Sequence, residues 1–567
     1  MRRWFLLCCC AFSLMLAALL PTAPAPAHAH ATAPLAPKLV RAAPPDLPAV
    51  DPNYIYNQLD DLATRFQGRE AGYDTNVAPL VNGHDEFATY WASEMQKNLA
   101  GFGATVTRDS FAISGWPGRP AVAPAVNVEV TVPGLAHPEQ VVLIGCHYDG
   151  EADSTQSAND DASGCVIELG IAQAMGTYWR AHAVYPARTL RFVLYDAEEQ
   201  GIFGSFHAVN TTVNGDLSNI VAMFNEEQSG IGYPLRFLGD IANPTLPMYA
   251  FVSPLHNSDI YPNQDALSPD QRAAITTFRA LLAQAIPAVF AEFHALGYTS
   301  LAYHDANGRS IGQPIFMADQ TGSVQLADDT VAASDEFPFT LAGLPCATFS
   351  GNFTYYDPGT PPPWSYPYDQ PQDTIQLMNT YANDTAEKAP ALALALALPG
   401  MLTSWMLAQP QILGTAVADG KPIAAISDVG AASPGKPLAL DASASYDPAG
   451  ASPLSYAWSF GDGATATGVS VTHTYTAAGA YSLTLTVTSA TGSRRIVKPL
   501  TVTSSPPAII NPFGAYHPTG YPRPNTNVIL PTPNPALAQA QAPPASSRSP
   551  GSSSGAGVHT AQVYVLL

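Results

Sequence analysis

Three apolar runs constrain the fold of this 567-residue chain more than any other feature. The runs are VVLIGCH at 141–147, LRFVLY at 190–195 and IVAMF at 220–224. Residues 163–179, between the first two runs, show the pattern of a helix. Continuous apolar strands separated by helices indicate strands that are buried on both faces, as in a parallel sheet covered by helices. The sequence therefore predicts an α/β domain with a doubly wound, largely parallel sheet.

Acidic residues and one histidine gather where these runs end. They are His147, Asp149, Asp160, Asp161, Glu198, Glu199, Glu226 and Glu227. Sites in open α/β sheets form at the carboxyl ends of the strands, so neighbouring strands would bring these side chains into one cluster. Buried carboxylates without counter-ions are costly through repulsion and desolvation, and cations remove that cost. The pattern therefore predicts a metal site, with two ions bridged by a carboxylate.

Each of these segments alone also has an ordinary structural explanation. The segment NDDASG at 159–164 fits a turn followed by a helix cap. The Glu198–Glu199 pair fits the solvated start of a helix. Their shared position at the ends of apolar strands makes the metal site the better interpretation.

Three segments carry a resemblance to a known family: GCHYDG at 145–150, NDDASG at 159–164 and DAEEQGIFGS at 196–205. They resemble the secreted co-catalytic zinc aminopeptidases, whose superfamily also contains glutamate carboxypeptidases and glutaminyl cyclases. The resemblance spans about residues 50–410. It implies a doubly wound α/β fold that holds two zinc ions bridged by one aspartate.

The resemblance also implies a role for each matching side chain. His147 corresponds to a ligand of one metal ion, and Asp160 corresponds to the bridging carboxylate. Glu199 corresponds to a ligand of the other ion. Glu198 corresponds to the general base, which takes a proton from the attacking water and passes it to the leaving amine. Asp149 is expected to orient His147.

The sequence departs from the family in the third apolar run. The family has an aspartate there, whereas this chain has Glu226 and Glu227. We interpret Glu227 as the ligand that completes the first site with His147 and Asp160. Glu226 remains a competitor for that role.

A second departure concerns the last ligand of the family, which is normally a histidine. In the segment YPYDQPQDT at 366–374, Asp369 stands where that histidine is expected. Upstream, Glu336 also stands where a histidine is common. A second site made of Asp160, Glu199 and Asp369 offers only oxygen ligands, so it would hold zinc less tightly and would admit manganese, magnesium or calcium. A distant histidine, His304 or His256, is the alternative ligand.

The N-terminus has the pattern of an export signal. Two arginines precede an apolar run, and small residues near Ala29 and Ala31 suit cleavage. We therefore predict a signal peptide at 1–31, an Ala/Pro-rich linker at 32–47 and a secreted or periplasmic protein. Beyond the signal, three cysteines remain, Cys146, Cys165 and Cys346, and the sequence does not tell which two of them would form a bridge.

The chain changes character after the predicted metallopeptidase domain at 48–412. Residues 421–505 show short alternating strands with Gly/Asp turns, which predicts a small all-β, immunoglobulin-like sandwich. The turn WSFGDG at 458–463 resembles that of a polycystic-kidney-disease (PKD) module, in which we expect Trp458 to be part of the core. The Pro/Ser-rich tail at 506–567 is predicted to be disordered.

The sequence as a whole predicts a secreted, metal-dependent aminopeptidase that acts on peptides or proteins. A formal net charge of −21 argues against nucleic acid and anionic membranes as partners. The PKD-like module is a candidate for contact with a polymer or a surface. The alternatives are a carboxypeptidase or dipeptidase, a glutaminyl cyclase, or an inactive binding protein stabilised by metal, and the presence of Glu198 argues against the last of these.

Overall fold

The computed structural model describes residues 47–502 except for thirteen short gaps. The gaps are 74–82, 117–118, 152–153, 213–216, 231–247, 259, 297–302, 305–309, 312–323, 330–333, 352–369, 382–390 and 427–431. The predicted signal peptide, nearly all of the predicted linker and the predicted tail lie outside the described residues.

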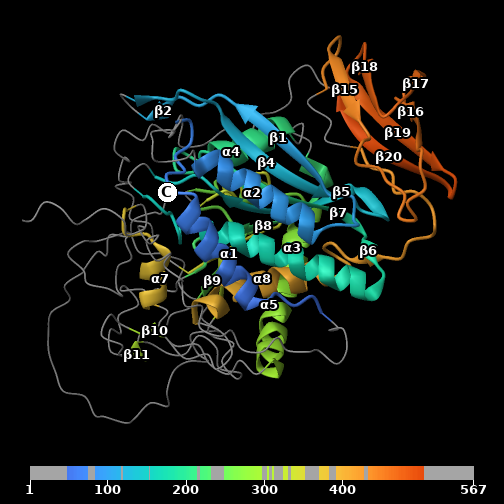
Figure 1. The fold of residues 1–567 in the computed structure, drawn as a ribbon. Coiled ribbons are helices and arrows are strands. Elements are labelled where there is room, and N and C mark those ends of the chain that lie inside the picture. The colour runs from blue at the N-terminus through green and yellow to red at the C-terminus, as the bar shows by residue number, and fades with distance from the viewer. Residues whose placement is uncertain are drawn as a thin grey trace, which may run out of the picture. The chain divides into compact units, whose positions relative to one another are not determined.

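An eight-stranded sheet forms the centre of the larger part of the molecule (Figure 1). Its strands, in spatial order, are β1 (Thr105–Phe111), β4 (Ala125–Val132), β7 (Arg188–Tyr195), β5 (His137–His147), β8 (Ile220–Glu226), β13 (Cys346–Ser350), β9 (Met248–Val252) and β12 (Val324–Asp328). Parallel pairs join β7 to β5, β5 to β8, β8 to β13 and β9 to β12. The remaining pairs are antiparallel. The predicted α/β fold with a largely parallel sheet is confirmed.

Helices cover both faces of this sheet. On one face lie α1 (Pro52–Arg65), α2 (Gly83–Asn98), α3 (Ala162–His182), α5 (Pro269–Ala295) and α8 (Ala391–Ala408). Within this layer α3 contacts β5 and β8, α2 contacts β4, and α1 and α8 pack against α3, as Figure 1 shows. The other face is covered by α6 (Phe337–Leu341) and by η1 (Ala208–Thr212), which directly follows the short α4 (Phe203–His207).

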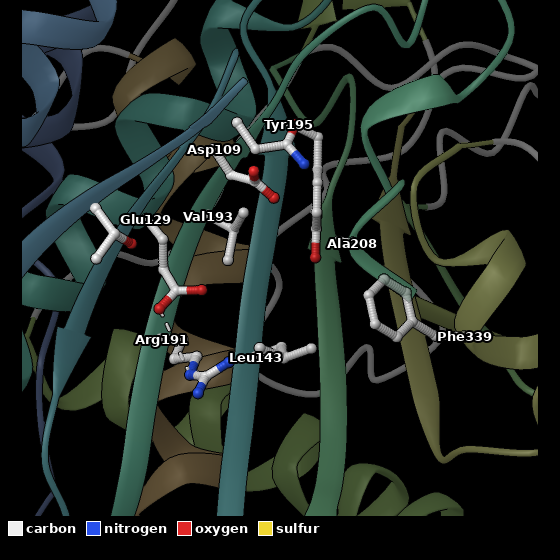
Figure 2. A pocket seen from close by; sticks show the side chains of 10 residues that line it. Asp109, Glu129, Leu143, Arg191, Val193, Tyr195, Ala208 and Phe339 are labelled. Atoms are coloured by element: carbon white, nitrogen blue, oxygen red, sulfur yellow. Dashed lines mark ion pairs between the residues drawn. The ribbon is translucent and has the colours of Figure 1, made fainter. Parts of the chain in front are cut away.

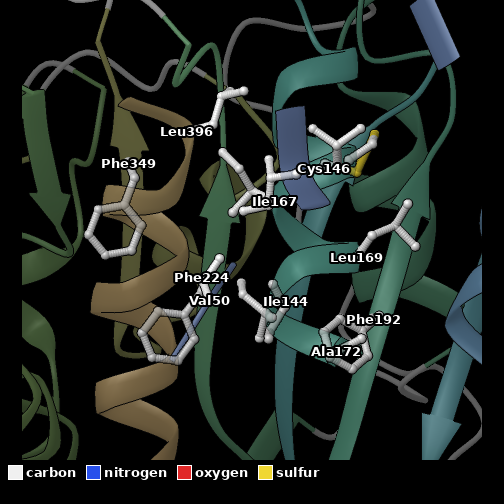
Figure 3. Close-up of a cluster of buried hydrophobic side chains, with 14 of the residues drawn as sticks. Val50, Ile144, Cys146, Ile167, Leu169, Ala172, Phe192, Phe224, Phe349 and Leu396 are labelled. Carbon is white, nitrogen blue, oxygen red and sulfur yellow. A yellow bond between two sulfur atoms is a disulfide. The ribbon is translucent and has the colours of Figure 1, made fainter. Parts of the chain in front are cut away.

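Side chains of the central strand β5 alternate between these two faces. Val142, Ile144 and Cys146 belong to the large core under α1, α3 and α8, part of which Figure 3 shows. Val141 and Leu143 belong to the smaller core on the opposite face. Burial on both faces explains why the run at 141–147 contains no polar alternation.

Two apolar helices invite the question of a membrane span. Among the described helices, α5 alone is long and apolar enough to cross a membrane, and part of it is buried against α8. The shorter α8 is buried over most of its length, as expected for a core helix.

The C-terminal strands form a separate all-β unit with its own core. They are β15 (Pro437–Asp441), β16 (Ser455–Ser459), β17 (Thr465–Thr467), β18 (Ser470–Thr474), β19 (Gly479–Ser489) and β20 (Gly492–Val502). One sheet has the order β17-β16-β19-β20, and the other pairs β15 with β18. Trp458 is buried between them, and its indole N–H donates to the carbonyl of Gly468 at 2.9 Å. The expectation that Trp458 belongs to the core is confirmed.

The remaining described elements are short. They are β2 (Gly115–Trp116), β3 (Arg119–Pro120), β6 (Tyr185–Pro186), η2 (Leu217–Asn219), η4 (Gln264–Ala266), β10 (Tyr303–His304), β11 (Ser310–Ile311), α7 (Ile375–Tyr381) and β14 (Thr415–Ala416). None of these short elements forms part of the eight-stranded sheet.

Candidate metal centre

The carboxyl ends of β5 and β8 bring together one histidine and two carboxylates. His147 is the last residue of β5, and its Nε2 lies 3.0 Å from Asp160 Oδ1 and 3.6 Å from Glu227 Oε1. One ligand atom from each residue lies within 4.8 Å of the others, and all three side chains are buried. The structure therefore brings together the three residues that the sequence assigns to the first metal ion.

The chemistry of this group fits a divalent cation. Burial alone would lower the pKa of His147, but the carboxylates of Glu227 and Glu198 raise it well above its usual range. Burial also raises the pKa of Glu227, against the favourable charge of His147. Imidazole nitrogen and carboxylate oxygen are both zinc ligands, and three protein ligands leave a coordination position open for water or substrate. A bound cation would replace the proton that this buried cluster otherwise attracts.

Asp149 connects the histidine to the two neighbouring glutamates. Its Oδ1 lies 3.5 Å from His147 Nδ1, on the side of the ring away from Asp160. The same carboxyl group accepts the backbone N–H of Glu198 at 3.1 Å and that of Glu199 at 3.3 Å. Asp149 is completely buried, and its one carboxylate contacts both the ring of His147 and the turn after β7.

The turn after β7 places Glu198 and Glu199 inside the molecule. Ala197 has a φ of 58°, in the left-handed region, and the carbonyl of Glu198 accepts the N–H groups of Gly201 and Ile202. Both glutamates are only 6% exposed. Burial raises the pKa of Glu198 well above its usual range, and the charges of Glu227 and Asp335 add to this effect against that of His147. The interpretation of the pair as a solvated helix start is wrong.

The loop that carries Asp160 is held by an acid from far along the chain. The carboxylate of Asp373 accepts the N–H of Asn159 at 2.9 Å and that of Asp160 at 3.1 Å. The next residue, Asp161, caps α3 through the N–H of Gly164 at 2.8 Å. The two aspartates of NDDASG therefore have different tasks, since one faces His147 and the other caps the helix.

A buried arginine holds the loops on which these acids stand. The guanidinium of Arg69 donates to the carbonyls of Tyr148 at 2.7 Å, Gln156 at 2.6 Å and Ser157 at 2.9 Å. Burial lowers the pKa of Arg69 to about 10, although Asp373 and other nearby acids act in the opposite direction. Sequence reasoning did not assign Arg69 or Asp373 to the site, because their partners are distant backbone groups that no local pattern reveals.

The structure separates the two glutamates of the third strand. Glu226 points toward the helix layer, where its Oε1 accepts the hydroxyl of Thr403 in α8 at 2.6 Å. Glu227 lies with His147, and its Oε2 accepts the hydroxyl of Ser334 at 2.6 Å. Neighbouring residues at a strand end face opposite sides of the sheet, which explains why only one of them reaches the cluster.

Two carboxylates before α6 also lie close to this cluster. Asp335 is fully buried, and burial raises its pKa to about 7, with His147 opposing and Glu227 adding to the effect. Glu336 is buried as well, and its Oε2 accepts the side-chain N–H of Asn225 at 3.1 Å. Sequence reasoning singled out Glu336 by comparison with the family and overlooked Asp335 next to it.

The proposed ligands of the second ion are only partly described. Glu199 is buried beside Glu198, whereas Asp369 lies outside the described residues. The side chain of His304 lies outside them too. The imidazole of His256 is 83% exposed and lies 3.2 Å from Asp265, so it is no part of the cluster.

Two of the three described cysteines form a disulfide next to the cluster. Cys146 in β5 is bonded to Cys165 in α3, and both are completely buried. Cys346 is a free, buried thiol, and burial raises its pKa to about 12. The ligand atoms of Cys146, Cys165 and Asp161 are close enough to resemble a metal site. The disulfide leaves neither cysteine with a thiolate that could bind a metal ion.

A cavity on the opposite face of the sheet is too small to hold a peptide. Figure 2 shows Asp109, Glu129, Arg191 and Phe339 around it, over the middle of the strands rather than at their ends. Its volume of about 30 Å³ has room for one or two water molecules. Arg191 Nε lies 3.5 Å from Glu129 Oε1 there. The cavity is therefore no substrate site.

Comparison with known families matches two segments of the chain. Residues 127–252 match the model of peptidase family M28, and residues 419–504 match that of the PKD domain. The M28 segment contains all the described residues assigned to the metal ions and to the general base. The PKD segment coincides with the all-β unit.

Curated relatives resemble only part of this chain. It is 30% identical over 217 residues to leupeptin-inactivating enzyme 1 of Streptomyces exfoliatus, which covers 37% of this chain and 43% of that protein. It is 39% identical over 92 residues to human carboxypeptidase Q, covering 15% of this chain and 18% of that protein. The chain thus spans less than half the length of these relatives.

Solved structures were compared as well. BSAP, a zinc aminopeptidase from Bacillus subtilis, aligns with 64% of this chain and 95% of its own, at 14% identity and a TM-score of 0.38. A glutaminyl cyclase from Porphyromonas gingivalis aligns with 63% of this chain and 98% of its own, at 15% identity and a TM-score of 0.37.

Proposed function

We propose that this chain, which carries a peptidase family M28 segment followed by a PKD domain, is a metal-dependent aminopeptidase that removes N-terminal residues from peptides. The observation that carries the proposal is the convergence of His147, Asp160 and Glu227 at one point, with Glu198 buried beside them. A protein named probable leucine aminopeptidase, from Arthroderma benhamiae, is 27% identical over 131 residues, which cover 22% of this chain and 35% of that protein.

Each residue of the proposed site has a separate task. His147, Asp160 and Glu227 would hold the first ion, and Asp160, Glu199 and Asp369 would hold the second. Two divalent cations would polarise the scissile carbonyl and acidify the attacking water. Zinc fits the first ligand set, whereas the oxygen-only second set would also accept manganese, magnesium or calcium.

Glu198 is the proposed general base. Its carboxyl group is buried next to the proposed ligand Glu199, where it could take a proton from water and later give it to the leaving amine. Asp149 holds the backbone N–H of Glu198 and thereby fixes the point from which its side chain extends. The adjacent Glu199 cannot share this task, because a carboxylate that binds a metal ion would stay ionised and would not take up the proton.

The segments before and after the peptidase part support a proposed location and a proposed contact. The signal-like segment at 1–31 supports export, which makes the protein secreted or periplasmic. The PKD domain is proposed to contact a polymer or a surface and so to keep the peptidase near its substrate.

Replacing Glu198 tests the mechanism directly. We expect Glu198→Gln to lower kcat on an aminoacyl-nitroanilide by at least about 100-fold, because the base is lost while its size is kept. Metal content, measured by mass spectrometry, is expected to stay unchanged, and Glu86→Gln on the exposed side of α2 serves as the matched control. Full activity of Glu198→Gln would refute the assignment.

A carboxypeptidase is the second candidate, because 92 residues are 39% identical to carboxypeptidase Q. An N-blocked peptide with a free carboxyl end separates the two functions. An aminopeptidase leaves that peptide intact and cleaves the nitroanilide, whereas a carboxypeptidase does the opposite. Conversion of an N-terminal glutamine to pyroglutamate would instead identify a cyclase.

A further inference from the structure

We propose that the disulfide between Cys146 and Cys165 positions the ligands of the first metal ion, so that the affinity of this site for metal depends on the bond. The inference rests on the proposed function only in so far as His147, Asp160 and Glu227 bind a cation. It assigns the two cysteines a part in the site beyond stabilising the fold.

The disulfide closes the segment of chain that carries two of the three ligands proposed for the first metal ion. Cys146 directly precedes His147 on β5, and Cys165 stands four residues after Asp161, the cap of α3. The bond joins positions 19 residues apart in sequence, with a Cα–Cα distance of 5.4 Å. The enclosed residues, 147–164, include both His147 and Asp160, together with Asp149.

The bond ties together the two elements from which the ligands project. His147 stands at the end of β5, and Asp160 immediately precedes the cap of α3, so any shift between strand and helix changes their separation of 3.0 Å. Cys165 Sγ also lies 3.1 Å from the carbonyl oxygen of His147. Figure 3 shows Cys146 with its sulfur bond among the core side chains of β5 and α3.

Other contacts hold this loop, but they hold different parts of it. Arg69 binds the carbonyl of Tyr148, directly after His147, and those of Gln156 and Ser157 in the second half of the segment. Asp373 binds the N–H groups of Asn159 and Asp160. These hydrogen bonds fix the loop against neighbouring elements, whereas the disulfide fixes its two ends against each other. The strand end that carries His147 is also paired with Tyr195 of β7. The disulfide adds a covalent connection from this strand end to α3, the helix that Asp160 precedes.

Zinc titration of the purified full-length protein tests this inference. The variant Cys146→Ala/Cys165→Ala is compared with the unaltered protein and with Cys346→Ala, which loses a buried thiol from the neighbouring part of the sheet. After metal removal, calorimetric titration gives the Kd for zinc. The titration is carried out well below the unfolding temperature of each protein. We expect the double variant to bind zinc about 10- to 100-fold more weakly, as for the loss of groups that orient ligands. Cys346→Ala is expected to bind as the unaltered protein does.

A purely structural role of the disulfide predicts a different result. In that case the unfolding temperature of the double variant falls while its Kd for zinc is unchanged, and the inference is overturned. If the alanine variant does not fold, Cys146→Val/Cys165→Ala restores part of the lost volume, and the same comparison of Kd values decides.

His147→Ala separates failure of the inference from failure of the proposed function. If the unaltered protein with its disulfide intact binds zinc no better than His147→Ala does, the proposed metal site is wrong and the inference falls with it. If His147→Ala loses zinc but the cysteine variant retains the full affinity, only the role of the disulfide is wrong.

Discussion

Asp149 shows how much one buried carboxylate contributes to this site. It lies 3.5 Å from the ring of His147 and accepts the backbone N–H groups of Glu198 and Glu199. A metal-bound histidine is usually oriented by such a partner on its second nitrogen. The carboxylate of Asp149 therefore connects the first ligand with the proposed base.

We expect Asp149→Asn to weaken zinc binding by about 10- to 100-fold, because an amide is a poorer acceptor and carries no charge toward His147. Turnover at saturating zinc is expected to fall as well, since the turn that holds Glu198 loses an ionic acceptor. Calorimetry and nitroanilide hydrolysis measure the two effects, and Asp60→Asn on the exposed side of α1 is the control. Unchanged zinc affinity would show that His147 is oriented by other contacts.

His84 provides a pH-dependent contribution behind the same turn. Its Nε2 lies 2.8 Å from Asp196, at the end of β7, and its ring stacks on Tyr148. Burial alone would lower the pKa of His84, but the charge of Asp196 and their hydrogen bond raise it to about 10. A histidine that binds its proton more tightly when folded stabilises the protein fully below its unfolded pKa of about 6.5.

This stabilisation is lost as pH rises from about 6.5 toward 10, with a slope of at most about 1.4 kcal/mol per pH unit. We therefore expect His84→Gln to be less stable than the unaltered protein at pH 6.5 and to lose less stability between pH 6.5 and pH 9. Urea unfolding at both pH values gives the change in unfolding free energy between pH 6.5 and pH 9 for each protein. An equal change for both proteins would show that His84 is neutral in the folded state.

At the scale of elements, the three buried strands β5, β7 and β8 were predictable, and the contacts of the loops that follow them were not. The apolar run at 141–147 predicts a strand that is buried on both faces. The side chains of β5 do belong to two cores, one on each face of the sheet. The ends of β5, β7 and β8 then follow from the parallel order, which explains why His147, Glu198 and Glu227 could be selected from sequence.

The contacts that hold the loops could not be predicted, because they join segments far apart in the chain. Asp373 reaches back more than 200 residues to the N–H groups of Asn159 and Asp160. Arg69 binds carbonyl groups, which carry no sequence signal at all. The sequence already favoured Glu227 over Glu226, but two adjacent glutamates offer the same chemistry. Only the structure shows that Glu227 lies beside His147 and Glu226 binds Thr403.

At the scale of the whole molecule, the proposed catalytic residues lie at the carboxyl ends of the central strands. An all-β unit with its own core follows in sequence. The M28 segment at 127–252 includes the ends of β5, β7 and β8, and the PKD segment begins at residue 419. Asp369 lies in neither segment. The assignment of a second ion therefore rests on the oxygen ligands that Asp160, Glu199 and Asp369 offer. Replacing the metal in the full-length protein tests this assignment.

Metal removal followed by reloading tests the central claim most directly. The purified protein is freed of metal, reloaded with zinc, manganese or calcium, and assayed on a panel of aminoacyl-nitroanilides. We expect no nitroaniline release without metal and restored release with zinc, which fits the ligand set of the first site. Release by the metal-free protein at the original rate would contradict the account, and so would the absence of release with every ion.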